Sequence, residues 1–269
     1  MIRLLKIELN KLRSFRAFWI LTGMYFVALA GTLLSIQGVF NTLLNDNVPT
    51  VMQAGLRWDF YSLPDGWHYM TWVSSLFNYL LPTIVIILIC AEFNYKTVRQ
   101  NVINGMGRAE WMAGKLVLMG FFALASTAVV VLCTVFMGLF NSDLSDGLDL
   151  FKQTGYVLGY FIQTSGYLIL AMLLSIIIRH TGITIGIMTI YSLFLELVVE
   201  QLSIHQFGMS KDLRVLFPLR AFSNLVMNPF SELTSGPLPV VDPTSLAVSL
   251  IYISIFAGIG FWLLKKRDL

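Results

Sequence analysis

Long apolar segments dominate the pattern of hydrophobic and polar positions along this chain. Crossing the hydrocarbon core of a bilayer as a helix takes about 20 mostly apolar residues. Six windows meet this requirement, at roughly 17–40, 70–91, 116–140, 156–178, 182–199 and 244–264. The two-residue alternation typical of an outer-membrane barrel does not recur along the sequence. Because backbone polar groups cannot face lipid unpaired, the pattern predicts an all-α polytopic membrane protein with six transmembrane helices.

Composition agrees with this interpretation and excludes several classes of protein. Of the 269 residues, 57% are hydrophobic and 12% are charged, whereas soluble domains carry about 25% charged residues. Little sequence remains for a soluble domain, so we interpret residues 1–269 as a single transmembrane domain. A net charge of +3 is too small to suggest a nucleic-acid partner. Cys90 and Cys133 lie inside apolar windows without the paired spacing of a metal or redox motif.

The basic residues are distributed unequally between the two sides of the predicted bundle. If the N-terminus is cytoplasmic, all but five of the 18 Lys and Arg residues fall inside, and the C-terminal Lys265, Lys266 and Arg267 return to the same side. The five exceptions are Arg57, Lys152, Lys211, Arg214 and Arg220. The positive-inside rule therefore predicts that both termini are cytoplasmic.

This orientation places the two longest loops, 41–69 and 200–243, outside. The second loop holds several prolines, among them Pro218, Pro229 and Pro237, and apolar pieces at 215–217 and 222–227 that are too short to cross a bilayer. We expect short interfacial or re-entrant helices that cap the outer mouth of the bundle. A flexible loop is the alternative.

The first sixteen residues have the periodicity of a basic amphipathic helix. Apolar residues recur at steps of three and four, at Ile2, Leu5, Leu9 and Leu12. Basic residues occupy another face, at Arg3, Lys6 and Arg13. Such a helix is expected to lie along the inner leaflet. Either it serves only the positive-inside rule or it has a dedicated docking role.

The segment 92–115, between the second and third windows, predicts an elbow of two helices. Apolar positions at helical spacing, Tyr95, Val98, Val102 and Met106, indicate a helix that continues out of the second span. The glycines of 105–107 permit a turn, and a second helix leads from residue 108 into the third span. Trp111 and Met112 are expected to be exposed near the apex. Because aromatic and Arg side chains concentrate binding energy, this favours a protein partner over a merely interfacial helix.

The residues of this elbow carry a family resemblance. Glu92-x4-Thr97-x-Arg99 followed by Asn104-Gly105-x2-Arg108-x2-Trp111-x2-Gly114-Lys115 resembles the elbow between spans two and three of ABC-2 type permeases. These are the membrane subunits of ATP-binding cassette (ABC) exporters with the ABCG-like, type V fold. The layout of the whole chain is similar as well, with an amphipathic start, six spans and a long outer segment before the last span.

The resemblance implies a mechanism and a set of partners. In that family the elbow is a coupling helix seated in a cleft of a separate ABC ATPase subunit, which binds ATP and Mg²⁺. Two permease copies, as a homodimer or a heterodimer, form the pathway in a bacterial-type inner (plasma) membrane. Residues 1–16 would be the connecting helix, and 200–243 would hold re-entrant helices. The coupling residues carried over are Glu92, Thr97, Arg99, Asn104, Gly105, Arg108, Trp111 and Lys115.

Two details of the elbow follow from this transfer. Glu92 is expected to pair with Arg99 or Arg108 and hold the elbow at a fixed angle. Family members often have a hydroxyl residue before the Arg, but this chain has Gly107 there, which puts a local helix cap in doubt.

The sequence lacks a nucleotide-binding motif of its own. A phosphate-binding loop needs G-x4-G-K-[ST], but Leu116 follows Gly114 and Lys115, and Ala109 stands where the first glycine belongs. We therefore expect a transport subunit rather than an enzyme, with no cofactor in this chain and ATP hydrolysis in a partner.

Polar residues inside the predicted spans are candidates for a pathway. Glu196 and Glu200 are four residues apart near the outer end of the fifth window, and carboxylates within a membrane are functional candidates by default. They either reach outer water, or line a vestibule for cationic or amphiphilic cargo, or couple to protons. Asn78 and Gln163 either form hydrogen bonds between helices or face a polar pathway.

Two other classes of function remain as alternatives. A secondary transporter should show inverted repeats, and no convincing similarity links 1–140 to 141–269. An intramembrane enzyme is expected less, because His68, His180 and His205 are isolated from matching acids and no serine-nucleophile motif occurs. A neighbouring gene for an ABC ATPase would favour the exporter.

Overall fold

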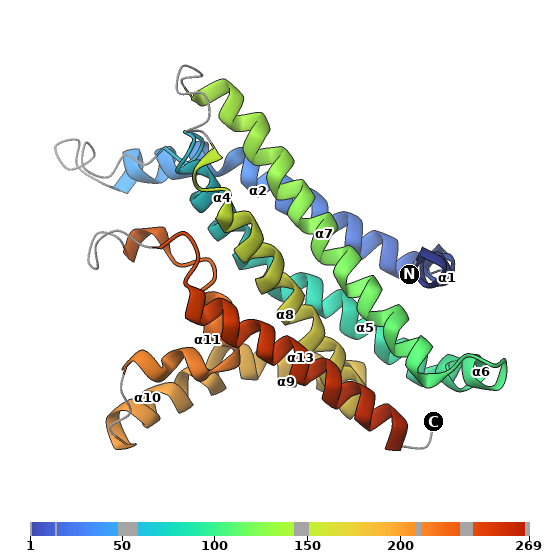
Figure 1. Cartoon of the computed structure of the whole chain (residues 1–269). Coiled ribbons are helices and arrows are strands. Elements are labelled where there is room, and N and C mark those ends of the chain that lie inside the picture. Colours follow the sequence, from blue (N-terminus) through green and yellow to red (C-terminus); the bar gives the residue numbers. More distant parts are fainter. Residues whose placement is uncertain are drawn as a thin grey trace.

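The computed structural model of this chain is a bundle of helices (Figure 1). It describes residues 2–13, 15–47, 59–142, 151–207, 211–231 and 239–266. All regular secondary structure in these ranges is helical. Six stretches are long and apolar enough to cross a membrane. The predicted all-α class and the six predicted spans are thus confirmed, and the chain is a multi-pass membrane protein.

Four of the six spans are single helices, and the first of them runs well past its predicted window. The first span is α2 (Arg16–Asn47), the third α7 (Arg108–Asn141), the fourth α8 (Gly155–Ile178) and the sixth α13 (Pro243–Lys266). The second span is composite, with α4 (Gly66–Ser75), η1 (Leu76–Tyr79) and α5 (Leu80–Asn94). The fifth comprises α9 (Thr181–Ile190), η3 (Tyr191–Leu195) and α10 (Glu196–Phe207). Shorter elements are α1 (Ile2–Arg13), α6 (Thr97–Ile103), η4 (Lys211–Leu216), α11 (Pro218–Ser223) and η5 (Pro229–Ser231).

Helix α8 is the centre of the bundle and contacts α13, α5 and α7. About two thirds of its apolar window is buried (67%), whereas α13 buries only 11% of its window. Tyr160 of α8 is fully buried and hydrogen-bonds Ser126 of α7, which in turn bonds Tyr25 of α2 (2.8 and 2.7 Å). This chain of hydroxyl groups joins three spans at a depth where no water is available to replace a lost bond.

The break in the second span has a local cause. Pro82 has no N–H, so it cannot bond the carbonyl of Asn78 four residues earlier. The backbone tightens there into the 3₁₀ turn η1. The Asn78 side chain uses this break to accept a hydrogen bond from Thr164 of α8 at 3.0 Å. An interhelical hydrogen bond at Asn78, one of its two predicted roles, is therefore confirmed.

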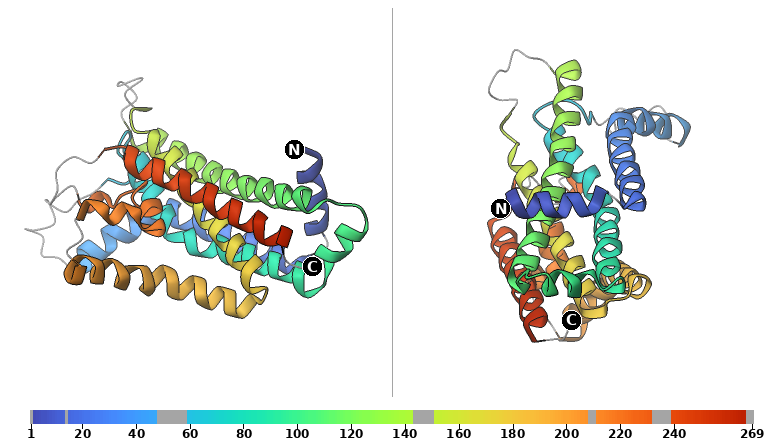
Figure 2. Two further views of the ribbon diagram at one scale, coloured as in Figure 1. Left: turned by 60° about the horizontal axis from the view of Figure 1, so that its bottom comes forward. Right: turned by 90° about the vertical axis from the view of Figure 1, so that its right-hand side faces the viewer.

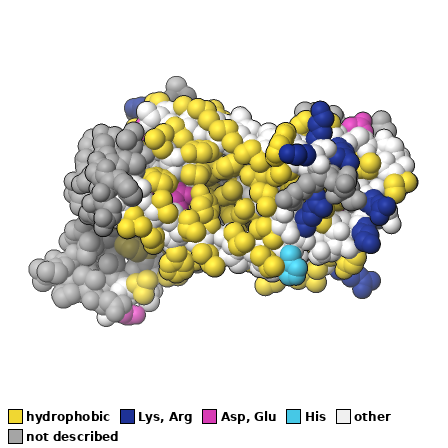
Figure 3. All heavy atoms as spheres, turned by 90° about the horizontal axis from the view of Figure 1, so that it is seen from below, with side chains coloured by type: hydrophobic (Ala, Val, Ile, Leu, Met, Phe, Trp, Pro, Cys, Tyr) yellow, Lys and Arg dark blue, Asp and Glu magenta, His cyan; other side chains and the backbone are white. Residues whose placement is uncertain are grey.

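One end of the bundle collects α1, α6 and the last turn of α13, and we call it the basic end (Figure 2). Figure 3 shows Lys and Arg side chains gathered at this end, beside a broad band of hydrophobic side chains. The sequence pattern assigned the same elements to the cytoplasm. That assignment stays a prediction that depends on the distribution of charge.

Helix α1 packs against α7 at the basic end. Leu12 is buried, and Leu5 and Leu9 pack against the same hydrophobic cluster. The predicted apolar stripe therefore faces the bundle in the part that the structure describes. The side chains of Ile2, Arg3 and Lys6 lie outside the described part.

The segment before the last span contains short helices, as predicted, at η4, α11 and η5. Phe222 of α11 is fully buried and lies against Gly166 of α8, and Leu225 lies against Gly159. A Cβ at residue 159 would stand 2.6 Å from the Leu225 carbonyl oxygen. The absence of a side chain on this face of α8 thus lets the segment dock. Its position relative to a membrane stays a prediction, and Pro237 lies outside the described residues.

We predict that Gly159→Ala lowers the free energy of unfolding by about 1–3 kcal/mol. The new methyl group would clash with the backbone oxygen of Leu225, which cannot move aside by a change of side-chain rotamer. Gly120→Ala in α7 is the matched control, since nothing lies within 4 Å of its Cβ position. Replacing a helical glycine there should be neutral or slightly stabilising. Thermal unfolding in detergent measures both, and equal midpoints would contradict the docking geometry.

Candidate functional site

The predicted elbow, residues 92–115, is present at the basic end but is built differently from the expectation. Helix α5 ends at Asn94, and Lys96 takes a left-handed conformation with φ 55° before α6 begins at Thr97. A left-handed residue cannot continue a right-handed helix. The predicted single helix running out of the second span is therefore wrong, and Tyr95 and Lys96 form a break.

The second bend of the elbow is where the sequence placed it. Gly105 has φ 92°, a conformation that costs glycine nothing, and nothing surrounds its Cβ position. Gly107 is extended and precedes the first residue of α7. Its N–H donates to the Glu110 carboxylate at 3.1 Å, so Glu110 supplies half of a capping box. This bond removes the doubt about a cap that the missing hydroxyl residue had raised.

A buried ionic cluster of Glu8, Glu92 and Lys115 fixes the elbow to the bundle. Lys115 of α7 is 0% exposed, and its Nζ lies 2.5 Å from Oε2 of Glu8 and 2.5 Å from Oε1 of Glu92. These three residues come from α7, α1 and α5. A buried charge is tolerated only when it is paired and hydrogen-bonded. The cluster therefore ties the three helices together at one point.

Lys11 and Trp111 complete the bonding of the two carboxylates. Lys11 donates to the second oxygen of Glu8 at 2.9 Å, and the Trp111 indole N–H donates to the second oxygen of Glu92 at 3.0 Å. Lys115 also lies 5.3 Å from the centroid of the Trp111 ring. Two acids thus face two cations, and all four carboxylate oxygens are bonded.

Burial by itself raises the pKa of the Glu8 carboxyl. The charge of Lys115 and the hydrogen bond from it oppose this effect, and Lys11 adds to the opposition. The net result is a Glu8 pKa below its usual 4.5. Glu8 is accordingly charged at neutral pH, and the cluster is a true ion pair network.

Two predictions about this region are wrong. Trp111 and Met112 are not exposed near an apex, since they are only 1% and 3% exposed. The Trp111 indole faces inward and bonds Glu92, and Met112 lies against Gly260 of α13. Glu92 in turn pairs with Lys115 rather than with Arg99 or Arg108. Lys115, carried over as a coupling residue, lies too deep for direct contact with another protein.

Arg108 links the elbow to the last span. Its guanidinium donates to the backbone carbonyls of Leu264 and Lys265 at 2.9 and 2.8 Å. These carbonyls belong to the last turn of α13, where helical carbonyls lack internal partners. A cation at this position also suits the negative end of the helix dipole. Arg108 therefore acts as a C-terminal cap in another helix.

Of the remaining coupling residues, one stabilises the break after α5 and three are exposed. Thr97 donates to the Glu92 carbonyl at 3.0 Å across the break. Arg99, Asn104 and Gly105 are exposed. Tyr95, predicted on the apolar side of a helix, and Ile103, for which no role was predicted, are 74% and 73% exposed. We call these five exposed residues the elbow tip; they are Tyr95, Arg99, Ile103, Asn104 and Gly105.

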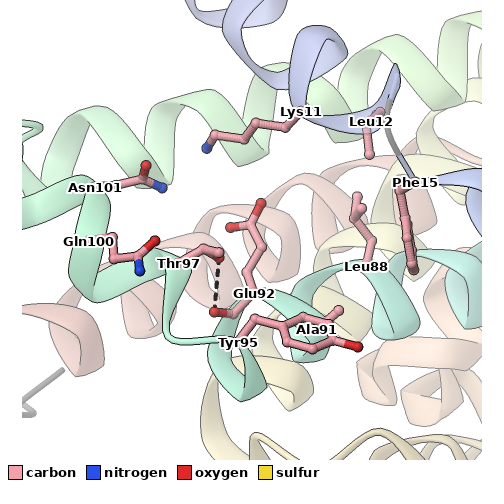
Figure 4. A pocket seen from close by; sticks show the side chains of 10 residues that line it. All are labelled: Lys11, Leu12, Phe15, Leu88, Ala91, Glu92, Tyr95, Thr97, Gln100 and Asn101. Carbon is pink, nitrogen blue, oxygen red and sulfur yellow. Dashed lines mark hydrogen bonds between the residues drawn. The ribbon is translucent and has the colours of Figure 1, made fainter.

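A cavity of about 370 Å³ opens beside the elbow tip, between α1, α5 and α6. Figure 4 shows Lys11 and Phe15 on one side of it, and Thr97, Gln100 and Asn101 on the other. Tyr95 and Glu92 form its floor. The cavity mixes apolar and amide groups, which is a composition suited to a protein side chain.

The two acids predicted near the far end of the fifth span are buried and bonded. Glu196 accepts from the backbone N–H groups of Leu219 and Arg220 at 3.2 and 2.7 Å, and Glu200 pairs with Arg214 at 3.1 Å. Neither side chain simply reaches water, because they are 7% and 3% exposed. Glu196 instead positions α11. A small cavity of about 170 Å³ adjoins both acids.

Asn78 and Gln163, the other pathway candidates, are 1% and 3% exposed. Asn78 bonds Thr164 as described above, while Gln163 Oε1 has no hydrogen-bond partner among the described residues. Within the described ranges, no three His, Cys, Asp or Glu side chains gather in an arrangement that could hold a metal ion.

We predict that Lys115→Met destabilises the protein by about 3–5 kcal/mol, because it leaves Glu8 and Glu92 buried without their cation. The control Lys11→Met removes a cation that is 29% exposed and should cost less than about 1 kcal/mol. Adding Glu8→Gln and Glu92→Gln to Lys115→Met should restore part of the loss. Thermal unfolding in detergent measures the series, and equal losses for the two lysines would contradict the cluster.

The lowered Glu8 pKa also predicts how stability depends on pH. A carboxyl with a lower pKa in the folded state stabilises that state above its unfolded pKa, near 4.5. This contribution is lost as the pH falls through the folded pKa. The difference in midpoint between the wild type and Glu8→Gln should therefore be largest near about pH 7 and shrink below about pH 4. A difference that is independent of pH would argue against a charged Glu8.

Comparison with known sequences places the chain in a family. A search of curated proteins finds no match. A family model described as a protein of unknown function, DUF2705, matches residues 50–269, which is well over half of the chain. The chain therefore belongs to the DUF2705 family.

Proposed function

We propose that this chain is the membrane subunit of an ABC exporter. In this proposal two copies, identical or related, form a translocation pathway, and a separate ATPase subunit binds ATP and Mg²⁺. The elbow 92–115 receives the movement of the ATPase and passes it to the spans. The proposal starts from the elbow motif and its similarity to ABC-2 type permeases.

The observation that carries the proposal is the contrast between the base of the elbow and its tip. The base is fastened to α1 and α5 through Lys115, and to α13 through Arg108. The tip, by contrast, exposes Tyr95 and Ile103 at the same end. A segment that only had to return the chain to the membrane would need neither a buried ionic cluster nor an apolar exposed tip.

Rigid attachment is what a transmitting element requires. A flexible loop would absorb a displacement of its tip by rotating backbone dihedrals, and nothing would reach the spans. Separating the buried ion pairs would cost several kcal/mol. The elbow and the helix ends bonded to it are therefore expected to move as one piece. A push on the tip would therefore displace the ends of α5, α7 and α13 together.

The elbow tip has the composition of a contact surface for another protein. Tyr and Arg are enriched where binding energy is concentrated, and Ile103 provides an apolar anchor beside Arg99. Asn104 adds a polar group at the bend. The cavity beside the tip offers a place for a protruding side chain of the partner.

We predict that Arg99→Glu and Ile103→Asp each weaken association with the ATPase subunit at least about tenfold, because each changes a side chain at the centre of the proposed contact. Gly105→Pro should have the same effect, because proline cannot adopt φ 92°. The candidate partner is an ABC ATPase encoded in a neighbouring gene, where the genome carries one. Co-purification and stimulated ATP hydrolysis are the measurements.

The matched control is Lys266→Glu, a charge reversal on an exposed residue at the same end. It should leave association unchanged. All variants should insert and purify like the wild type, because none touches the buried cluster. Unchanged association and hydrolysis in Arg99→Glu and Ile103→Asp would refute the role of the elbow tip.

A further inference from the structure

A second hollow at the basic end is lined by three cations. Lys96 and Arg99 belong to the elbow, and Arg179 ends α8. The lining residues are Phe93, Asn94, Lys96, Val98, Arg99 and Arg179, with no acid among them. The hollow measures about 240 Å³. We call it the basic pocket.

Two of the residues that line the basic pocket have a left-handed backbone conformation. Lys96 and Arg179, with φ 55° and 56°, are the two residues other than glycine that take positive φ in the described part of the chain. Each follows the last turn of a span, a position where glycine or asparagine is the usual choice because it avoids a steric cost. Both positions carry a cation instead, and both side chains line one hollow. Such local strain is typical of functional sites.

A helix dipole alone does not account for this arrangement. A cation near the end of α5 or α8 gains energy from the negative end of the helix. Any exposed basic residue in the last turn would gain as much without a positive φ. The dipoles also give no reason for Arg99, inside α6, to converge on the same hollow.

The aromatic wall of the pocket holds one of its cations in place. The guanidinium of Arg179 lies 4.9 Å from the centroid of the Phe93 ring. The nearest acid in sequence, Glu92, is turned away and bonded to Lys115 and Trp111. Glu92 therefore does not neutralise the cations of the pocket.

We propose that the basic pocket binds the phosphate group of an anionic phospholipid from the leaflet at the basic end. Guanidinium and ammonium groups are the usual ligands of phosphate oxygens. The volume is below the range of about 300–1,000 Å³ for drug-sized ligands, and it suits a head group. Basic pockets between transmembrane helices at this level bind anionic head groups in general.

The surroundings favour a lipid over a soluble phosphate. The pocket lies where two spans end, at the last residues of α5 and α8. Helix α9 begins two residues after Arg179, packs on α5 and exposes Ile183 and Ile187. An acyl chain can follow this apolar face while its head group occupies the pocket. The inference does not depend on the proposed coupling to an ATPase.

The test compares two variants that each remove two positive charges at the same end. Lys96→Asn with Arg179→Asn removes two cations of the pocket, and asparagine tolerates positive φ. Lys265→Asn with Lys266→Asn is the control at the exposed end of α13. Bound phosphatidylglycerol and phosphatidylcholine are counted by native mass spectrometry on the full-length protein purified in neutral detergent.

We expect the wild type and the control to retain phosphatidylglycerol in preference to phosphatidylcholine. The pocket variant should bind phosphatidylglycerol about tenfold more weakly. Lys96→Arg with Arg179→Lys keeps both charges and should bind like the wild type. If the asparagine variant does not fold, Arg99→Gln gives a second measurement, because its position in α6 carries no backbone constraint.

Three outcomes would overturn the proposal. Equal losses in the pocket and control variants would mean that diffuse charge attracts the lipid. Equal retention of both lipids by the wild type would mean that only the acyl chains bind. Displacement of phosphatidylglycerol by millimolar inorganic phosphate, together with phosphate binding in the absence of lipid, would assign the pocket to a soluble anion.

Discussion

The structure at the basic end depends on a single buried ammonium group. Lys115 is surrounded by protein and pairs with Glu8 and Glu92 from two other helices, while Lys11 supplies the second positive charge. Helix α1 has only 12 residues, which is too few for an isolated helix to be stable in water. Its fixed position therefore depends on this pairing and on the leucines around it. Removing any member would leave the others charged and buried.

Deeper in the bundle, neutral hydrogen bonds connect the helices, as the ion pairs do at the basic end. The hydroxyl groups of Tyr25, Ser126 and Tyr160 join α2, α7 and α8, and Thr164 joins α8 to the break at Asn78. In a lipid environment, burial of apolar side chains gives no hydrophobic driving force for one helix pairing over another, because lipid is equally apolar. These few polar contacts, with the glycines at 159 and 166, therefore select the register in which the spans meet.

Hydropathy predicted the six spans correctly because span length and apolarity are local properties. The bend at Gly105 was predictable for the same reason, since positive φ favours glycine. The partner of Glu92 was not predictable, because Lys115 is buried only when α1 supplies Glu8 from more than 100 residues away. The composition of the elbow suggested that Trp111 is exposed at an apex, but its indole N–H bonds Glu92 inside the bundle. The break at Lys96 was missed because lysine carries no turn signal.

The elbow joins spans that differ in how much of their apolar surface is buried. Through Lys115 it holds α5 and α7, which belong to the core, and through Arg108 it holds the end of α13, which buries only 11% of its apolar window. A displacement of the elbow meets resistance in proportion to the packing that it disturbs. Under the proposed function, a displacement of the elbow therefore reaches α13, which contacts the bundle mainly along α8. The fifth span is similarly exposed at 18% buried, and Glu196 connects it to α11, which contacts α13. A path from the elbow to the opposite end thus runs along the periphery, around a core that stays packed.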